Sequence, residues 1–151
     1  MSTAYTDFGN DLYAYLRGID ITAIEPEGWA NTFNRPFEPE EVTAGGYPTL
    51  MVVPARDQTA TLDSRTDTDT VTFWAFLYYS VHDVVLGSEE KLRQLVDLVR
   101  TNLRSERIAI QALGGDDTYD IRFSGEWGWD NERGERFYRL EVTASIADTI
   151  Y

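Results

Sequence analysis

The chain has 151 residues, of which 42% are hydrophobic and 13% aromatic, a length and composition that fit one folded domain with its own core. It contains no cysteine, which excludes disulfides, thiolate metal sites and cysteine nucleophiles. It also has no apolar run of about 18 residues, so we expect no membrane-spanning segment.

Charge is the strongest bulk signal. The 26 acidic and 13 basic side chains give a net charge of −13, which disfavours sequence-independent binding to nucleic acid because phosphates are repelled. Lys91 is the single lysine among the basic residues. Low lysine with excess acid suits a protein made in high salt, although a GC-rich genome gives a similar arginine bias and solubility alone is the simplest interpretation.

The N-terminal segment predicts an amphipathic helix over residues 3–17, with Gly18 at its end. Its apolar residues recur at helical spacing: Tyr5, Phe8, Leu12, Tyr15, Leu16 and Ile19. Ser2 or Thr3 can cap its start. We expect residues 19–24 to form a short extended segment.

Residues 25–47, called the arm below, show no clear period and are rich in proline and glycine. Irregular segments of this length are uncommon inside compact domains and are usually functional or disordered. The arm carries Trp29, Phe33 and Phe37, which argue against disorder. We expect these rings to cover a surface, either the chain's own core or that of a neighbour.

Tyr47 to Pro54 reads as a strand bracketed by prolines, as at a sheet edge or strand end. Residues 55–70 follow, rich in threonine and aspartate, and predict an acidic loop or a hairpin with a mobile tip. Its aspartates repel one another, so we expect it to project from the body, and its threonines allow it to order as a strand against a partner.

Val71 to Val81 is the clearest strand, and both of its faces are apolar or aromatic, as in a central strand with protein on each side. Ser88 to Leu103 predicts a second helix, capped by Ser88. Its expected buried stripe consists of Leu92, Leu95, Val96, Val99 and Leu103. Residues 108–113 predict another short strand.

The C-terminal third predicts a β-hairpin that turns at residues 130–134. Its first strand places Tyr119, Ile121, Phe123, Trp127 and Trp129 at alternating positions, and its second does so with Tyr138, Leu140, Val142, Ala144 and Ile146. The whole chain, residues 1–151, is therefore expected to be a single α+β domain. Its mostly antiparallel sheet is flanked by two main helices and accompanied by the arm and the hairpin.

No combination of residues indicates a catalytic, metal or cofactor site. His82, the single histidine, precedes Asp83, but neighbours on a strand point to opposite faces, and no serine-nucleophile motif is present. Asp63, Asp67 and Asp69 do not follow the order of a calcium loop. The possible glycosidase pair of Glu126 and Glu141 means little on a sheet this acidic. Trp127 and Trp129 could stack on sugars or bases, although core filling is the ordinary interpretation.

The order of these segments resembles a known family. A helix leads into an irregular arm, Tyr47-Pro48 opens a strand, an Asp/Thr segment feeds the long strand, and Arg139-Leu140-Glu141-Val142 lies in the last strand after the second helix. This is similar to the tail terminator (tail completion) proteins of long-tailed bacterial and archaeal viruses. The likeness covers most of the chain and rests on element order and short strings. Head-closure and other neck proteins have similar layouts and remain an alternative.

The resemblance implies a structural protein of the virion tail, assembled in the host cytoplasm, with no enzymatic activity and no cofactor. Such a protein forms a ring of subunits, usually a hexamer, on the end of the tail tube. Its partners are its own copies, the tail tube protein and a neck or head-completion protein, while DNA passes through the lumen without specific binding. The candidate interface residues are Trp29, Phe33, Phe37, Arg56, Asp63, Arg65, Asp67, Asp69, Trp74 and Phe76.

Two other classes of function stay open. The first is a small acidic binding module that holds a peptide or sugar with Trp127, Trp129 or the arm. The second is a hydrolase without a recognised motif, which we rank last.

Overall fold

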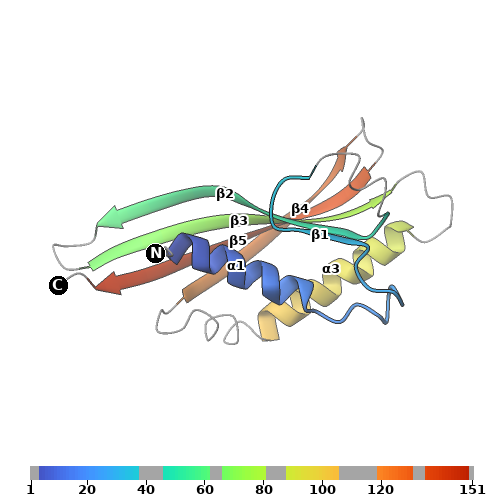
Figure 1. The fold of residues 1–151 in the computed structure, drawn as a ribbon, viewed down its shortest axis with the longest axis horizontal. Helices are drawn as coiled ribbons and strands as arrows, with labels where there is room; N and C mark the ends of the chain where they lie inside the picture. The colour runs from blue at the N-terminus through green and yellow to red at the C-terminus, as the bar shows by residue number, and fades with distance from the viewer. Residues whose placement is uncertain are drawn as a thin grey trace.

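A computed structural model describes residues 4–37, 46–61, 66–80, 88–105, 119–130 and 135–149. They form an α+β fold with two helices and a mixed five-stranded sheet of order β1-β2-β3-β5-β4 (Figure 1). Only β1 and β2 pair in parallel; the other neighbours are antiparallel. The elements are α1 (Ala4–Arg17), β1 (Asn31–Phe33), β2 (Thr49–Thr61), β3 (Thr66–Ser80), α3 (Ser88–Ser105), β4 (Tyr119–Asp130) and β5 (Glu135–Thr149).

The segment after α1 is a turn, so the prediction of an extended stretch at residues 19–24 was wrong. The amide groups of Ile24 and Glu25 both donate to the carbonyl of Ile21 at 2.9 Å. The carboxylate of Asp20 accepts from the Thr22 hydroxyl at 2.6 Å and from its amide at 3.0 Å, the local bonding by which aspartate favours turns. These bonds, the hydroxyl first, lower the pKa of Asp20 below its ordinary value.

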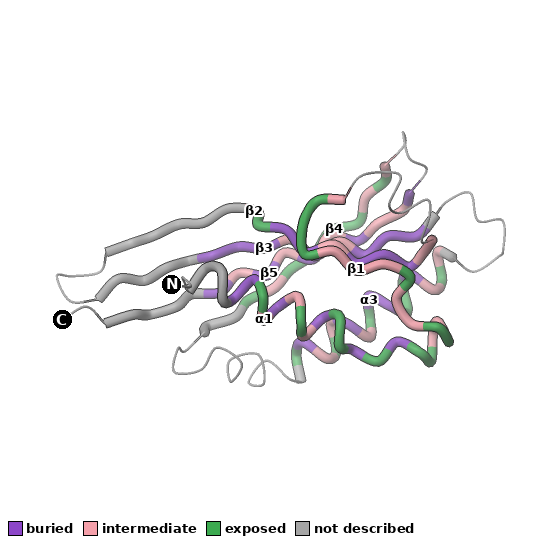
Figure 2. Tube along the Cα trace, viewed as in Figure 1, coloured by how far each residue is buried: buried purple, intermediate pink, exposed green. Residues whose placement is uncertain are grey.

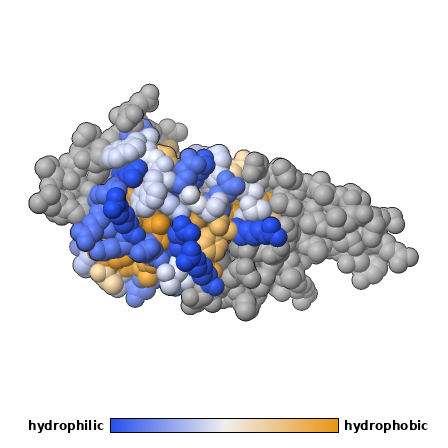
Figure 3. All heavy atoms as spheres, turned by 180° about the vertical axis from the view of Figure 1, so that it is seen from behind, coloured by the Kyte–Doolittle hydropathy of each residue, from blue (hydrophilic) through white to orange (hydrophobic). Residues whose placement is uncertain are grey.

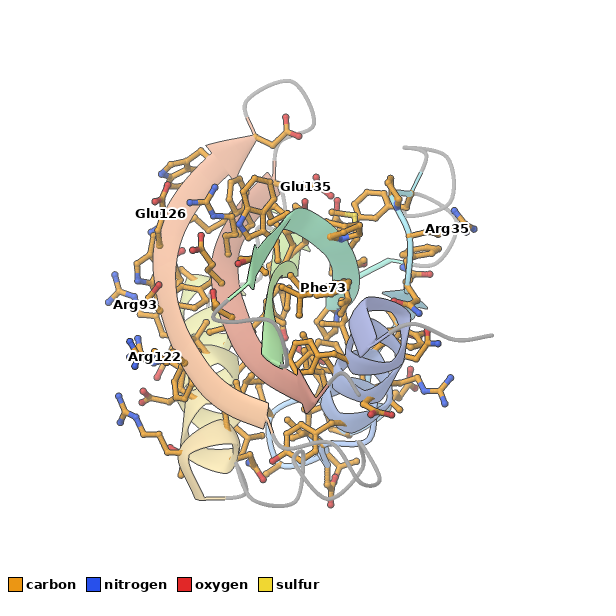
Figure 4. All side chains as sticks on the ribbon, turned by 90° about the vertical axis from the view of Figure 1, so that its left-hand side faces the viewer. Arg35, Phe73, Arg93, Arg122, Glu126 and Glu135 are labelled. Carbon is orange, nitrogen blue, oxygen red and sulfur yellow. The ribbon has the colours of Figure 1, made fainter. Side chains whose placement is uncertain are left out.

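The core lies between the two helices and one face of the sheet, and Figure 2 shows buried residues along the facing sides of both layers. The predicted stripe of α3 is confirmed, because Leu92, Leu95, Val96, Val99 and Leu103 are all buried. Phe73 of β3 lies between the sheet and α1 (Figure 4). A Cβ on Gly9 of α1 would come within 2.6 Å of the Phe73 ring, so the glycine permits this close packing.

β3 is the central strand, as the sequence predicted, with β2 on one side and β5 on the other. β2 continues through Pro54, where its register with β3 shifts between Pro54 and Arg56. Because β1 pairs only with residues 49–51 of β2, the remaining length of β2 is a sheet edge, which is where a strand tolerates proline. β1 itself lies inside the arm, where the sequence indicated no strand.

Residues 55–61 and 66–70, expected in an acidic loop or a hairpin, are strand residues of β2 and β3, which pair antiparallel as the hairpin alternative predicts. This part of β3 is paired on both sides, because it also forms an antiparallel ladder with the end of β5, from Thr66↔Thr149 to Thr70↔Ser145. We call residues 56–61, 66–70 and 145–149 the ribbon. In Figure 1 its three strands extend past the first residue of α1. The connecting residues 62–65, the predicted strand at 108–113, and His82 with Asp83 lie outside the described residues.

Candidate interaction surfaces

The face of the sheet that points away from the helices, called the outer face below, carries a group of aromatic rings. Alternate residues of β3 supply Trp74, Phe76 and Tyr78, and β5 supplies Phe137. The Phe76 and Tyr78 rings stack at 5.6 Å, and Phe137 lies 5.5 Å from Phe76. Phe137 sits directly opposite Gly128 of β4, whose missing Cβ leaves room for its ring.

The arm extends this aromatic group. The Phe33 and Phe37 rings are 5.2 Å apart, and Phe37 meets Tyr78 edge-on at 5.3 Å. The structure thus brings together four of the candidate interface residues, namely Phe33, Phe37, Trp74 and Phe76. Trp29 does not join them, because its side chain packs against the buried core instead.

The outer face is only partly covered. Tyr78 is buried, whereas the rings of Trp74, Phe76 and Phe137 are half-buried. Both helices of the described chain lie on the opposite face of the sheet (Figure 1). Seen from behind, the described surface shows apolar patches between charged side chains (Figure 3). Partly exposed apolar residues beside charged side chains are a candidate protein–protein contact.

Charged side chains contact the aromatic group at Trp74. The Arg139 guanidinium lies 4.7 Å from the centre of the Trp74 ring and donates to Glu126 at 3.1 Å. The indole N–H of Trp74 donates to Glu141 at 3.2 Å. Glu126 and Glu141, considered above as a catalytic pair, are each engaged in this arrangement. Sequence reasoning missed Phe137 and Arg139, although their alternation with Tyr138 and Leu140 places them on the outer face once β5 is a strand.

A second aromatic pair lies on β4, and here the expectation of core filling was wrong. Trp127 is 39% exposed and Trp129 is 58% exposed. The Arg136 guanidinium lies over both rings, 5.0 Å from the centre of the Trp127 ring and 4.5 Å from the centre of the Trp129 ring. Arg136 also donates to both carboxylate oxygens of Glu89, at 3.1 and 3.4 Å, which fixes the stack against the start of α3.

Polar contacts join the first turn of the arm to the body. The Tyr79 hydroxyl donates to Glu25 at 2.9 Å, and Lys91 lies 3.2 Å from the same oxygen of Glu25. Burial, and then the Glu25 carboxylate, raise the pKa of Tyr79 far above its ordinary value. These groups connect β3, α3 and the arm.

The remaining candidate residues belong to the ribbon or to its connection. Arg56, Asp67 and Asp69 are strand residues of the ribbon, while Asp63 and Arg65 lie outside the described residues. Within the described ranges, no three histidine, aspartate or glutamate side chains gather as metal ligands. No helix in the described part of the chain is both long and apolar enough to cross a bilayer.

Comparisons with known proteins give structural similarities but no family. No protein family matches the sequence, and neither does any curated protein. Among solved structures, a chain of a particle described as the virion of a native gene transfer agent is similar at a TM-score of 0.47 and 14% identity. The match covers 91% of this chain and 94% of that chain. A similarity of this size does not assign a function, so the proposals below rest on the residues of this chain.

Proposed function

We propose that the protein is a structural component of a virion tail, which forms a ring of subunits at the end of the tail tube. In this role it stops tube polymerisation and joins the tail to the neck. The observation that carries the proposal is the outer face. Both helices that the structure describes lie on one side of the five-stranded sheet, and its other side carries half-buried aromatic rings. Burying these rings against another protein removes apolar area from water at about 25 cal/mol per Å².

Two further features support a ring through which DNA passes. The net charge of −13 disfavours adhesion of phosphates to a lumen. The ribbon extends β2, β3 and β5 beyond the core, and its composition of threonine and aspartate gives it little to bury within its own subunit. Extended strands with few apolar side chains are suited to contacts with neighbouring subunits.

The expected partners follow from this role. They are further copies of the chain, the tail tube protein and a neck or head-completion protein. The protein is proposed to act without cofactor or catalysis. A head-closure or neck ring would use the same surfaces, and the identity of the partner that binds the ring distinguishes the two.

The test is the molar mass in solution, measured by light scattering over a range of concentrations, with the tail tube protein of the same virus present or absent. We expect wild type to form a ring alone or on the tube. Phe76→Asp should abolish assembly without unfolding the chain, because the Phe76 side chain is half-buried. Trp129→Ala, an exposed aromatic of the other surface, is the matched control and should assemble normally.

A second candidate function is a monomeric binding module, favoured by the exposed pair of Trp127 and Trp129 with Arg136 between them. Flat aromatic surfaces of this kind stack on sugars and peptides. A protein that stays monomeric with tubes present and loses binding to a glycan or peptide array on Trp129→Ala would favour this alternative over the ring.

A further inference from the structure

Helix α3 and strand β4 form the sides of a groove of about 450 Å³. Three arginines of α3 line it, Arg93, Arg100 and Arg104, and their separations of seven and four residues place them along one stripe of the helix. Among the described residues of the lining, Asp97 is the only acidic one. The groove is therefore cationic, in a chain whose net charge is −13.

Tyr138 of β5 positions the central arginine of this groove. Its buried hydroxyl accepts a hydrogen bond from Arg100 at 2.9 Å, which orients the guanidinium and leaves its charge in place because a phenol is a neutral acceptor. A Cβ on Gly125 of β4 would overlap this hydroxyl, so the glycine leaves the space in which Tyr138 lies. Trp127 of β4 meets the Tyr138 ring at 5.0 Å and is itself exposed. The groove thus has a cationic side on α3 and an aromatic side on β4.

The arginines of the groove are available to a partner. Among the described residues, neither Arg100 nor Arg104 forms an ion pair. Arg93 lies 3.4 Å from Glu89, but its side chain is 69% exposed, and Figure 4 shows it projecting from the side of the molecule that α3 and β4 form. Guanidinium groups bind carboxylates through pairs of parallel hydrogen bonds. The groove can therefore receive a ligand that carries several carboxylates.

We propose that this groove binds an acidic, extended peptide segment of a partner protein. Arg93 and Arg104 are separated by about 16 Å along the helix axis, which is the length of about five residues of an extended chain. Carboxylates at alternate positions of such a chain are about 6.8 Å apart, close to the spacing of about 6 Å between Arg100 and Arg104 along the helix. The side chains between the carboxylates then point the other way, toward Trp127.

A peptide fits these observations better than other anions do. A single phosphate needs its donors around one point, whereas the three arginines are spread along α3. A nucleic acid carries its charge far beyond the groove, where a chain with 26 acidic side chains repels it. A short acidic segment places its charge on the groove alone. The inference goes beyond the proposed ring, which could form through the outer face without it.

Fluorescence anisotropy with a labelled synthetic peptide tests the binding. The probe alternates glutamate with threonine and carries one leucine at its centre, and the same peptide with glutamine in place of glutamate is its control. Wild type should bind the first peptide and not the second. Arg100→Gln with Arg104→Gln should weaken this binding by at least about tenfold, because two charge-assisted contacts are lost.

The matched control removes the same charge from another part of the surface. Arg17 and Arg35 are both exposed, and Figure 4 shows Arg35 on the opposite side of the molecule from Arg93. Arg17→Gln with Arg35→Gln should leave the affinity within about twofold, because salt screens distant charges. Equal losses in the two double variants, or a wild type that binds neither peptide, would overturn the inference. Arg104→Gln alone changes an exposed side chain, so it repeats the test without disturbing the core.

A second readout locates the peptide without changing any charge. The chain has no cysteine, so Thr101→Cys places a single environment-sensitive dye at an exposed position of the groove lining. The unlabelled glutamate peptide should change the emission of this dye. It should not change the emission of a dye on Ala23→Cys, an exposed residue of the turn after α1. Equal responses at the two positions, or none at residue 101, contradict the inference.

Two other occupants have their own outcomes in the same assays. Single-stranded DNA of the same net charge that binds more tightly than the peptide, and loses binding in the Arg100→Gln and Arg104→Gln variant, would assign the groove to nucleic acid. A response of the dye at residue 101 to added wild-type protein would assign it to a second copy. Either result overturns the proposed peptide.

The ring and the groove fail separately. Rings formed by a protein that does not bind the glutamate peptide would remove only this inference. Binding of the peptide in the groove of a protein that never joins tail tubes would keep the groove and remove the proposed function.

Discussion

The strands β2, β3 and β5 each run through two regions of different character, the body of the sheet and the ribbon. In the body, β3 alternates Val71, Phe73, Ala75 and Leu77 toward the helices, and all four are buried. In the ribbon, the same strand continues that face with Asp69 and Asp67. The backbone pairing continues through both regions, while the sequence changes from apolar to polar at these positions of β3.

This difference distinguishes the residues that stabilise the fold from the residues that are open to contact with another protein. The body requires apolar residues at alternate strand positions because those side chains form the core. The ribbon lengthens three strands with a sequence rich in threonine and aspartate, and the register pairs Asp67 with Asp148. Substitutions in the two regions should therefore differ in size and even in sign.

The largest effect is expected in the body. Leu77→Ala removes a side chain that is 1% exposed at the centre of the sheet and should lower the free energy of unfolding by about 2–5 kcal/mol. Thr68→Ala in the ribbon should change it by less than about 0.5 kcal/mol. Urea denaturation measures both. Equal losses would show that the ribbon contributes to the fold as the body does.

Gly9→Ala tests the contact between α1 and β3. A Cβ at residue 9 would come within 2.6 Å of the Phe73 ring, so we expect a loss of about 1–3 kcal/mol, seen as a lower midpoint of thermal unfolding. Phe73→Leu should be less harmful in the Gly9→Ala background than in wild type, because the smaller side chain makes room. Additive losses from the two substitutions would argue against this contact.

Much of the body could be predicted from the sequence, and the reason is periodicity. The stripe of α3 and the central position of β3 follow from apolar spacing that burial requires. β1 was missed because Asn31, Thr32 and Phe33 are too few to show a period, and their pairing depends on residues 49–51. The sequence left a loop and a hairpin open for residues 55–70, and it could not show the added pairing with β5, which comes from the far end of the chain.

The outer face could be predicted only in part, for a similar reason. Trp74 and Phe76 were visible as an aromatic face of one strand. Phe137 and Arg139 join them through the register between β3 and β5, which no local pattern fixes. The exposure of Trp127 and Trp129 was missed because alternation marks a face of a strand without saying whether a helix covers it.

Tyr79→Phe should have a smaller effect, about 1 kcal/mol, because Glu25 keeps its contact with Lys91. The raised pKa of Tyr79 also gives a signature in pH. The folded phenol keeps its proton above pH ~10, where the unfolded phenol loses it, so this contribution is complete below pH ~10 and declines as the pH rises further. Wild type should thus lose more stability than Tyr79→Phe between pH 9 and 11; identical curves would contradict the assignment.

The smallest effect is expected in the ribbon and has the opposite sign. Asp67→Asn removes one of two directly opposed carboxylates and should stabilise the free protein by about 0.2–1 kcal/mol, measured by urea denaturation. Thr66→Asn on the other face is the control and should be neutral. Destabilisation by Asp67→Asn would mean that Asp67 stabilises its own subunit, and the contrast between body and ribbon would fail.

We propose that this protein ends a tail tube with a ring. The most direct test is electron microscopy of negatively stained tail tubes of the same virus, grown with the wild-type protein added part-way through polymerisation. The account predicts tubes with a ring on one end that stop lengthening once it is bound. Tubes that keep growing at the same rate, with bare ends and the protein left in solution, would contradict it.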